Sequence, residues 1–571
     1  MTIQLIDTQG VRVAIEGCGH GQLHAIYASI DESCKARGWD GVDVVLIGGD
    51  FQAVRNAADL NSMAVPVKYR ELGDFPEYYS GRSKAPYLTL FIGGNHEAAS
   101  HLWELYYGGW VAPNIFYLGP ANVLRVGPLR IAGMTGIWKG FDYKKTHHER
   151  LPFSGDDVRS FYHVREVDVR KLLLLRTQVD IGMSHDWPRL IERHGDEKRL
   201  FRMKRDFEKE SYDGTLGNPA ATYVLDRLRP PYWFSAHMHC KFSALKRFPP
   251  PSGGQVDDAP SAETPAEPVT PAPALVQAAE PQANPDEIDL DMDDDAALAA
   301  PSTEEAAATT TTEATSSGVA DHLRAQLPAS FAKPEKKEKS TPGQPVPPGI
   351  TNRETRFLAL DKCLPGRHFL QLCEVHPHDP AESAKHPPSS ESPRYRLQYD
   401  PEWLAITRVF SKDLIIGDAA ASYPPDLGEA HYAPLIDAEL AWVNENIVAK
   451  DKLDVPDNFV ITAPPHEEWQ PHAVPEQADE YTNPQTAAFC ELIEVPNLWD
   501  ASEVEREQRR MEGPAQTQWR GGRGGRGGGG GGGGGGRFDR GRGGRGGRRG
   551  GGGWGRGRGG GRGGGWGGGG Y

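Results

Sequence analysis

The chain has 571 residues, six scattered cysteines and a formal net charge of −15, and it contains no apolar run long enough for a transmembrane helix. This composition argues against a disulfide framework, excludes an integral membrane protein and leaves room for two or more domains. The first ten residues lack the basic flank and apolar core of a signal peptide, so we expect a soluble intracellular protein with no membrane partner.

The charge is distributed unevenly along the chain. Residues 520–571 contain twelve arginines and a single acidic residue, Asp539. The rest of the chain is therefore more acidic than the total indicates. An acidic body joined to a basic tail indicates a polyanionic partner for the tail.

Within residues 1–250, apolar strand-like runs alternate with helix-like patterns. After the run at 11–16, similar runs occur at 42–50, 87–97, 178–188 and 231–242, and polar residues follow each of them. Between the first two, the spacing of apolar residues predicts a helix whose buried face carries Leu23, Ile26, Tyr27, Ile30 and Cys34. The alternation predicts an α/β fold whose strand ends converge at one edge, where such sheets bind ligands.

Residues 251–350 break this pattern. They are rich in proline, alanine, threonine and acidic residues, which predicts a disordered linker. Its acidic run, DEIDLDMDDD, either mimics nucleic acid or binds a basic partner, or is simply solvated. Strand-like runs resume at 355–375 around a Pro-Gly turn, and we expect residues 351–377 to complete the sheet of the first domain.

The last two regions carry no catalytic motif. Residues 378–510 are predicted to form a second, mostly helical domain. Residues 511–571 form an RGG-rich tail that is predicted to be disordered and to bind RNA or RNA-binding proteins. The arginines expected to contact RNA include Arg520, Arg523, Arg526, Arg540, Arg542 and Arg545. A spacer or a role in phase separation, without direct RNA affinity, is the alternative for this tail.

Residue types that ligate metals follow the apolar runs in order. They are Cys18, His20, Asp50, Asn95, His185, His237 and His239. Two divalent cations that share one carboxylate suit the hydrolysis of a phosphodiester, and Asp50 is the natural bridge. On an extended segment His237 and His239 would point the same way, one toward each metal. Each element alone is a weak signal, whereas five in order after strands are a strong one.

This ordered set resembles the calcineurin-like metallophosphoesterases, whose pattern is D-x-H, GD, GNH[DE], H and GHxH and whose fold is a β-sandwich flanked by helices. Cys18 stands where that pattern has aspartate, and SAHMH replaces GHxH. With GGNHEAASHLWELYYGGW, GIWKGFDYKKTHHERLPF and SHDWP, residues 11–250 are similar to the RNA lariat debranching enzymes. TRFLALDKCLPGRHFLQL and NPQTAAFCELIEVPN resemble the C-terminal domain of that family.

The resemblance implies hydrolysis of the 2′–5′ phosphodiester at the branch point of excised introns. Its substrate would be lariat RNA and its location the nucleus, with shuttling to the cytoplasm left open. One metal would be held by Cys18, His20, Asp50 and His239, and the other by Asp50, Asn95, His185 and His237. His96 would be the general acid for the leaving 2′-oxygen. A His96 that only hydrogen-bonds beside the site, and a Cys18 that binds no metal, are the alternatives.

The cysteine also bears on the metals expected. A thiolate favours zinc or iron over magnesium or calcium. We therefore expect Fe²⁺ and/or Zn²⁺ in the two sites, with Mn²⁺ as the alternative because many members of the superfamily use it.

One predicted loop combines aromatic and basic residues that suit RNA. These are Trp138, Lys139, Phe141, Tyr143, Lys144 and Lys145. Aromatic rings can stack on unpaired bases while lysines contact phosphates. Buried aromatic residues beside a solvated lysine face remain an equal alternative.

Two other functions are compatible with parts of the sequence. A different metallophosphoesterase, such as a general nuclease, would share the metal ligands, but GGDFQAVRN lacks the GDxxDRG segment of protein phosphatases. A non-catalytic RNA-binding protein is disfavoured because every ligand position holds a competent residue.

Overall fold

The structure is a computed structural model that describes residues 10–249, 341–389 and 393–514. Most of the predicted linker, up to residue 340, lies outside the described residues, as does the RGG tail from residue 515 with its six named arginines. Among those described, none of the helices combines the length and apolarity needed to cross a bilayer.

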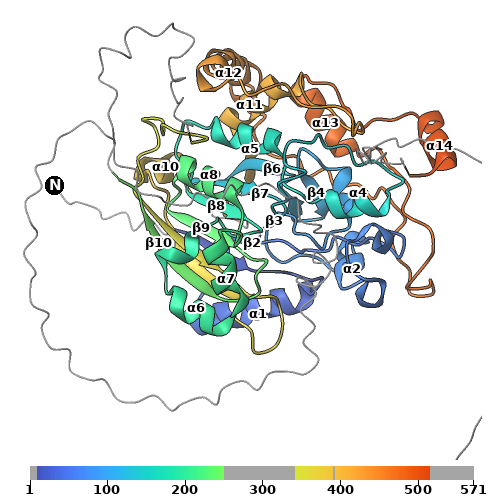
Figure 1. The fold of residues 1–571 in the computed structure, drawn as a ribbon, viewed down its shortest axis with the longest axis horizontal. Helices are drawn as coiled ribbons and strands as arrows, with labels where there is room; N and C mark the ends of the chain where they lie inside the picture. The colour runs from blue at the N-terminus through green and yellow to red at the C-terminus, as the bar shows by residue number, and fades with distance from the viewer. Residues whose placement is uncertain (1–9, 250–340, 390–392, 515–571) are drawn as a thin grey trace, which may run out of the picture. The chain divides into compact units, whose positions relative to one another are not determined.

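Two mixed sheets form the centre of the fold, which confirms the predicted α/β class (Figure 1). The six-stranded sheet has the order β12 (Leu370–Val375), β1 (Val11–Glu16), β2 (Val44–Ile47), β3 (Thr89–Phe91), β5 (Ile115–Tyr117), β4 (Gly109–Ala112). The seven-stranded sheet has the order β10 (Phe242–Arg247), β11 (Glu354–Ala359), β9 (Tyr232–Ser235), β8 (Ile181–Ser184), β7 (Leu129–Met134), β6 (Ala121–Val126), β13 (Leu397–Tyr399). The parallel strands are β1, β2, β3 and β5 in the first sheet and β11, β9, β8 and β7 in the second. β6 pairs antiparallel with both of its neighbours.

Alternation along the strands explains how the two sheets pack. Val13 and Leu46 share one buried cluster with residues of the second sheet such as Ile131 and Met183. Their neighbours, such as Val45, join a separate cluster with residues of α1 (Leu23–Arg37). Because successive side chains of a strand point to opposite faces, the first sheet lies between the second sheet and α1. The predicted buried face of this helix is confirmed, since all five of its named residues are buried.

The remaining helices of the first 250 residues surround this pair of sheets. They are α2 (Phe75–Tyr79), α3 (Ala99–Trp103), α4 (Gly155–Ser160), α5 (Glu166–Leu173), α6 (Glu197–Met203), α7 (Asp206–Asp213) and α8 (Pro219–Leu228). Helix α8 begins where the Asn218 side chain accepts the backbone N–H groups of Ala220 and Ala221, and Pro219 occupies the first turn. Three short 3₁₀ segments, η1 (Asp59–Ser62), η2 (Val67–Tyr69) and η3 (Ile191–His194), lie between them.

Two strands beyond the linker complete the sheets. β12 pairs antiparallel with β1, and β11 lies between β9 and β10. The strand before the predicted turn, β11, joins the seven-stranded sheet, and the strand after it, β12, joins the six-stranded sheet. Residues 250–340 separate both strands in sequence from β1–β10. Both sheets thus depend on residues that are far apart in the chain.

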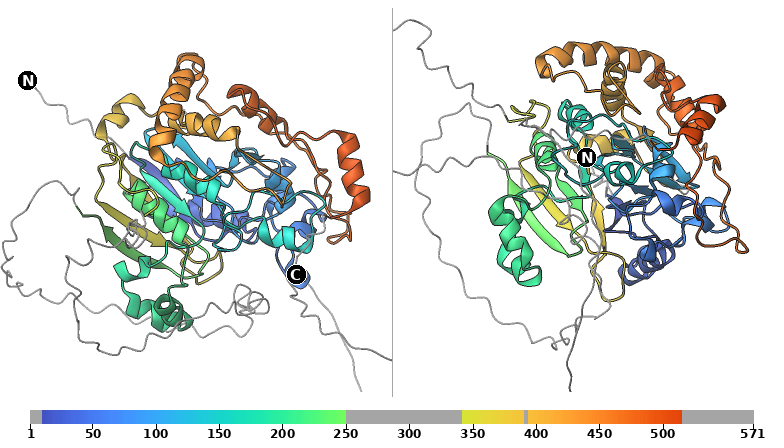
Figure 2. Two further views of the ribbon diagram at one scale, coloured as in Figure 1. Left: turned by 45° about the horizontal axis from the view of Figure 1, so that its top comes forward. Right: turned by 45° about the vertical axis from the view of Figure 1, so that its right-hand side comes forward.

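The C-terminal region combines helices with irregular chain. Its helices are α10 (Pro380–Lys385), α11 (Pro401–Ser411), α12 (Glu429–Val443) with the π-turn η5 (Asn444–Val448), α13 (Pro484–Leu492) and α14 (Glu503–Glu512). The described segment 455–482 has no helix or strand. Figure 2 shows α11 and α12 packed together beside α5, and β13 adds a strand to the edge of the second sheet.

Asp400 joins this region to the second sheet. Its carboxylate accepts hydrogen bonds from Arg130 Nε and Nη2 at 2.8 and 2.7 Å and from Arg125 Nε at 2.9 Å. It also caps α11 by accepting the N–H of Trp403 at 3.1 Å. Burial alone would raise the pKa of Asp400, but the two arginines outweigh it and lower the pKa to about 2.

This lowered pKa predicts an acid-dependent loss of stability. The ionised Asp400 stabilises the fold above the pKa of an unfolded aspartate, about 3.9, and that stability is lost as the pH falls through about 2. We expect Asp400→Asn to lower the free energy of unfolding by about 2 kcal/mol at pH 7. This difference in stability between the wild type and the variant should become smaller below pH 4. Thermal melting of both proteins between pH 3 and pH 7 measures the difference.

Asp437 provides the control, because it forms an exposed pair with Arg176 and such pairs contribute little. Asp437→Asn should melt with the wild type at every pH. A difference for Asp400→Asn that stays constant across the pH range would contradict the assignment.

Candidate metal centre

All seven predicted metal-ligating residues lie at the carboxyl ends of parallel strands. Those from the first sheet follow β1, β2 and β3, and those from the second follow β8 and β9. The set comprises Cys18, His20, Asp50 and Asn95 from the first sheet and His185, His237 and His239 from the second. Contacts across the two sheets, described below, show that these strand ends meet at one place.

Four residues of this set have a left-handed backbone. Their φ angles are 42° at His20, 46° at Asp50, 61° at His237 and 46° at His239. Such angles are uncommon outside glycine and cost about 1–3 kcal/mol each. The prediction that His237 and His239 share an extended segment is therefore wrong, because β9 ends at Ser235 and a turn carries both imidazoles.

Asp50 lies at the centre of the set and is fully buried. Its Oδ1 accepts the backbone N–H of His96 at 2.9 Å and lies 3.5 Å from Nε2 of His185. Its Oδ2 lies 3.8 Å from Nε2 of His20. One carboxylate thus faces ligand candidates from both sheets, as a bridging ligand must.

The first group of donor atoms includes the thiol. Ligand atoms of Cys18, His20, Asp50 and His239 all lie within 4.8 Å of one another. The Nε2 atoms of His20 and His239 are 3.3 Å apart, and the backbone N–H of His237 donates to Sγ of Cys18 at 3.2 Å. One sulfur, two imidazoles and one carboxylate match the donors that zinc and iron accept.

The second group is centred on His185. Its Nδ1 donates to the carbonyl oxygen of Gly48 at 2.8 Å, because a carbonyl oxygen can only accept. Its Nε2 therefore presents a lone pair toward Asp50 and toward Oδ1 of Asn95, which is 3.2 Å away. Burial lowers the pKa of His185, which favours the neutral, ligating form. The His237 ring lies 4.9 Å from that of His185, and its Nδ1 has no hydrogen-bond partner among the described residues.

Two glycines allow this close approach. A Cβ atom on Gly94 would lie 2.1 Å from Oδ1 of Asp50. A Cβ atom on Gly49, where φ is 122°, would lie 2.2 Å from Nδ1 of His185. Neither position accepts a side chain without displacing a ligand candidate.

His96 lies beside both groups. Its backbone N–H is held by Asp50, and its ring centroid is 5.6 Å from that of His20. The residue is buried but lines the cleft described below. This places an imidazole at the edge of the metal centre, where a substrate in the cleft would meet it.

Two buried acids near Asp50 escaped the sequence analysis. Glu97 accepts the backbone N–H groups of Phe51, Gln52 and Gly94 at 2.8–2.9 Å, and so holds the loop that carries Asp50. Burial and the neighbouring Asp50 raise its pKa to about 7. Burial and Asp50 also raise the pKa of Glu16 well above its ordinary value. The final position of GNHE was a signal for Glu97, whereas no local pattern marked Glu16.

The surroundings fit bound cations. Both carboxylate oxygens of Glu16 are buried without a hydrogen-bond partner among the described residues. Three acids, Glu16, Asp50 and Glu97, are thus buried close together, and after burial itself the charge of Asp50 raises the pKa of both glutamates by repulsion. Divalent cations at the two groups of donors would offset this repulsion, so the residues present fit a two-metal centre.

A cleft of about 770 Å³ opens over the centre. Of the predicted RNA-contacting residues, Trp138 and Lys139 line it together with His96. Phe141 is 69% exposed, so the alternative in which it is buried is wrong. Lys144 is also exposed but does not line the cleft.

The two other residues of that predicted loop are engaged elsewhere. Tyr143 packs against Trp138 with ring centroids 4.8 Å apart, and its hydroxyl-bearing ring is half-buried against the core. Lys145 pairs with Asp142 at 2.5 Å. The structure thus places Trp138 and Lys139 at the cleft and the rest of the set around them, and their role in RNA binding stays a prediction.

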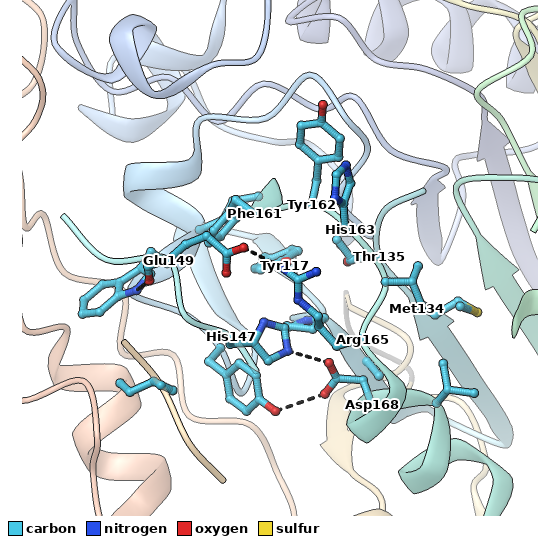
Figure 3. A pocket seen from close by; sticks show the side chains of 18 of the residues that line it. Tyr117, Met134, Thr135, His147, Glu149, Phe161, Tyr162, His163, Arg165 and Asp168 are labelled. Carbon is cyan, nitrogen blue, oxygen red and sulfur yellow. Dashed lines mark hydrogen bonds and ion pairs between the residues drawn. The ribbon is translucent and has the colours of Figure 1, made fainter. Parts of the chain in front are cut away.

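A buried ionic network follows the loop 138–145 and connects the chain after it to the core. A small cavity of about 40 Å³ lies here, and its lining includes His147 and Asp168. Figure 3 shows these two side chains pointing toward each other. His147 Nε2 lies 2.7 Å from Asp168 Oδ2. Glu149 and Arg165 pair beside them. Burial opposes ionisation of Asp168, but Lys171 and His147 outweigh it and hold its pKa below the ordinary range. The segment is therefore fixed to the body of the protein.

Comparisons with known proteins cover both parts of the chain. A family model of calcineurin-like phosphoesterases matches residues 11–241, and a model of the lariat debranching enzyme C-terminal domain matches residues 352–498. The lariat debranching enzyme of Schizosaccharomyces pombe is 40% identical over 491 residues, which is 85% of this chain and 96% of that relative. Those of Danio rerio and Homo sapiens are each 36% identical, covering 86% and 89% of this chain and 67% and 73% of the relatives.

The contacts of Glu97 generate a prediction about the centre. Glu97→Ala removes the acceptor of three buried N–H groups, so the loop that positions Asp50 should loosen. We expect the protein to retain less metal after dialysis, and its hydrolytic rate to fall about 100-fold. Metal content is measured by inductively coupled plasma mass spectrometry.

Glu97→Gln keeps one acceptor oxygen and should show an intermediate loss. Glu77→Ala is the control, since Glu77 is a partly exposed acid that bonds the Ser83 hydroxyl. Full metal retention and activity in Glu97→Ala would show that the Asp50 loop does not need this carboxylate.

Proposed function

The chain belongs to the lariat debranching enzyme family, and from this premise we propose how it hydrolyses the 2′–5′ phosphodiester at the branch point of lariat RNA. The observation that carries the proposal is the convergence of two donor groups on Asp50, with His96 beside them at the floor of a cleft. Two-metal hydrolysis of a phosphodiester places two cations and a proton donor within reach of one phosphate.

Two divalent cations, when bound, would neutralise charge on the phosphate and lower the pKa of water. One cation would be held by Cys18, His20, Asp50 and His239, and the other by Asp50, Asn95, His185 and His237. The protein supplies the fixed positions of these donors. Its left-handed turns and the hydrogen bond from His185 to Gly48 orient the imidazoles before substrate arrives.

His96 would act as the general acid. Its ring borders the cleft while its backbone is tied to Asp50, so the proton donor and the bridging carboxylate keep a fixed separation. Donation of a proton to the 2′-oxygen would let that oxygen leave as the hydroxyl of the branch nucleotide. The phosphate would remain on the 5′ end of the departing strand.

The two donor groups differ in softness, which bears on the metals. The first contains a thiolate, and the second contains an amide oxygen in its place. Zinc or iron suits the first group best, whereas the second group accepts zinc, iron or manganese. Fe²⁺ and/or Zn²⁺ are therefore the proposed metals, with Mn²⁺ as the alternative.

The remaining parts of the proposal follow from the substrate class. Trp138 and Lys139 at the cleft are the best placed of the predicted residues to contact the branch region. The RGG tail would raise the local concentration of RNA through its arginines. The nucleus is the proposed location because introns are excised there, with shuttling to the cytoplasm left open.

Cleavage of a branched RNA tests the function. Protein purified without oxygen and supplied with zinc and iron should cut a branched RNA at its 2′–5′ bond and leave a linear 3′–5′ strand intact, as read on a denaturing gel. His96→Ala should lower the rate about 100- to 10,000-fold with RNA binding unchanged, since a general acid contributes that much.

Cleavage of the linear strand would instead identify a general nuclease. Binding without cleavage under any metal would leave a non-catalytic RNA-binding protein as the better account. His24→Ala is the control, since His24 lies on α1 outside the centre and its Nδ1 forms a hydrogen bond with the hydroxyl of Tyr78 on α2.

Metal preference gives a second test. Cys18→Asp exchanges a soft ligand for a hard one, so the protein should shift its preference from zinc toward manganese. After dialysis against equal concentrations of both metals, we expect the bound ratio of zinc to manganese to fall about tenfold or more. Cys34→Ala, at a buried position on α1, should leave the ratio unchanged. An unchanged ratio in Cys18→Asp would mean that the thiol does not bind metal.

A further inference from the structure

The cleft over the metal centre is lined by charged side chains of both signs, and its acidic residues are Asp186, Asp206 and Glu210. Four cationic side chains line it, namely Arg70, Lys139, Arg159 and Lys204. Arg159 is largely exposed and pairs with Asp156 on its own helix at 3.3 Å. Arg70 is different, because it follows η2 and lies partly buried in the wall of the cleft.

Arg70 is fixed without a negative partner. Its Nε donates to the carbonyl oxygen of Val65 at 2.7 Å, and its Nη1 donates to Oδ1 of Asn61 at 3.2 Å. It forms no ion pair with any described residue, whereas the buried Arg55 and Arg165 both face carboxylates. Burial alone lowers the pKa of Arg70, with no acid near enough to oppose it.

An arginine held in this way suits an anion that comes from outside. Partly burying a cation without a counter-charge costs free energy, and a ligand that supplies the charge recovers it. Two donors are already used on neutral oxygens, so the side chain is oriented before binding and loses little freedom when a ligand arrives. The remaining N–H groups of the guanidinium match the geometry of phosphate oxygens.

The C-terminal region sets the position of Arg70. Asn61, which holds its guanidinium, donates from Nδ2 to the carbonyl oxygens of Val474 and Glu476 at 2.7 and 2.8 Å. The next residue, Gln477, exchanges two hydrogen bonds with the backbone of Phe153 at 2.7 and 2.8 Å. Residues 474–477 therefore bind the wall that carries Arg70 and also the chain that leads into α4.

We propose that Arg70 binds a non-scissile phosphate of the branched RNA, and that Asn61 and residues 474–477 act as positioning residues for it. The inference deepens the proposed function and rests on it. A branch nucleotide carries phosphates at its 5′, 3′ and 2′ oxygens, whereas a linear nucleotide carries only two of the three. With the 2′ phosphate at the metal centre, a fixed cation in the same cleft selects RNA that presents a further phosphate at the right distance.

Single-turnover cleavage by the full chain, with metals supplied, tests the inference. Arg70→Gln should raise the branched-RNA concentration that gives half the maximal rate roughly 10- to 100-fold, because a charge-assisted contact is lost. The maximal rate should stay within about threefold, since the arginine does not touch the reacting atoms. Arg70→Lys keeps the charge but loses the two hydrogen bonds that orient the guanidinium. Its half-saturating RNA concentration should lie between those of the wild type and Arg70→Gln.

Arg82→Gln is the matched control. Arg82 is likewise a partly exposed arginine near the C-terminal region and donates to the carbonyl oxygen of His466 at 3.4 Å, but it pairs with Glu468 and does not line the cleft. Its half-saturating concentration and maximal rate should match the wild type. Asn61→Ala should give a smaller rise than Arg70→Gln in the half-saturating concentration, with the maximal rate again preserved.

A substrate series identifies the contact directly. One non-scissile phosphate at a time is replaced by an uncharged methylphosphonate in the branched RNA. One replacement should raise the half-saturating RNA concentration of the wild type as much as the Arg70→Gln substitution does. The same replacement should cause no further rise in the Arg70→Gln protein. Because this comparison uses the wild type as well, it holds even if a variant melts at a lower temperature.

Equal effects of every replacement on both proteins would overturn the inference and would show that Arg70 only supports the wall of the cleft or contacts a base. Failure of the wild type to cleave the unmodified branched RNA would instead refute the proposed function. The two failures are therefore distinguishable.

Discussion

The position of the Asp50 carboxylate is the constraint on which the rest of the site depends. It lies where the strand ends of two sheets meet, and its oxygens face imidazoles from both. Gly49 and Gly94 leave no room for a side chain next to it. Any drift of Asp50 would separate the two donor groups and move His96, which it holds by the backbone. The extensive buried core that the two sheets share is what makes this strained, acid-rich arrangement tolerable.

The C-terminal region belongs to the same arrangement. GGDFQAVRN departs from the phosphatase pattern, and the structure gives a physical reason. Arg55 of that stretch is fully buried, pairs with Asp59 and Glu104, and donates to the Thr462 hydroxyl at 3.0 Å. The loop after the bridging aspartate is thus bound to the C-terminal region. A paired, buried arginine of this kind fixes one geometry, since removal of any partner leaves an unbalanced charge.

Local sequence patterns could predict the metal ligands, but not their backbone conformation or the buried residues around them. Apolar runs followed by ligand residues indicated where the metal centre lies, because the carboxyl ends of parallel strands share an edge. The same spacing could not reveal the positive φ angle at His237, so the prediction that His237 and His239 lie on an extended segment was wrong. Glu16 and Arg70 belonged to no motif. Among the described residues, Glu16 is buried without a hydrogen-bond partner and Arg70 is partly buried without an ion-pair partner, which the sequence does not reveal. The pairing of β12 with β1 joins residues more than 350 positions apart, beyond the reach of any local pattern.

Charge distribution explains why the site needs fixed cations at all. The chain as a whole is acidic, with a net charge of −15, and its arginine-rich segment lies beyond the catalytic region. Residues 1–250, which carry the metal centre, contain 32 lysines and arginines and 29 acidic residues, so their formal charge of +3 provides little long-range attraction for RNA. Attraction has to act at short range inside the cleft, where metals and cationic side chains face the phosphates. Screening by salt is weak at such distances, so local placement of charge, and not the total, governs binding there.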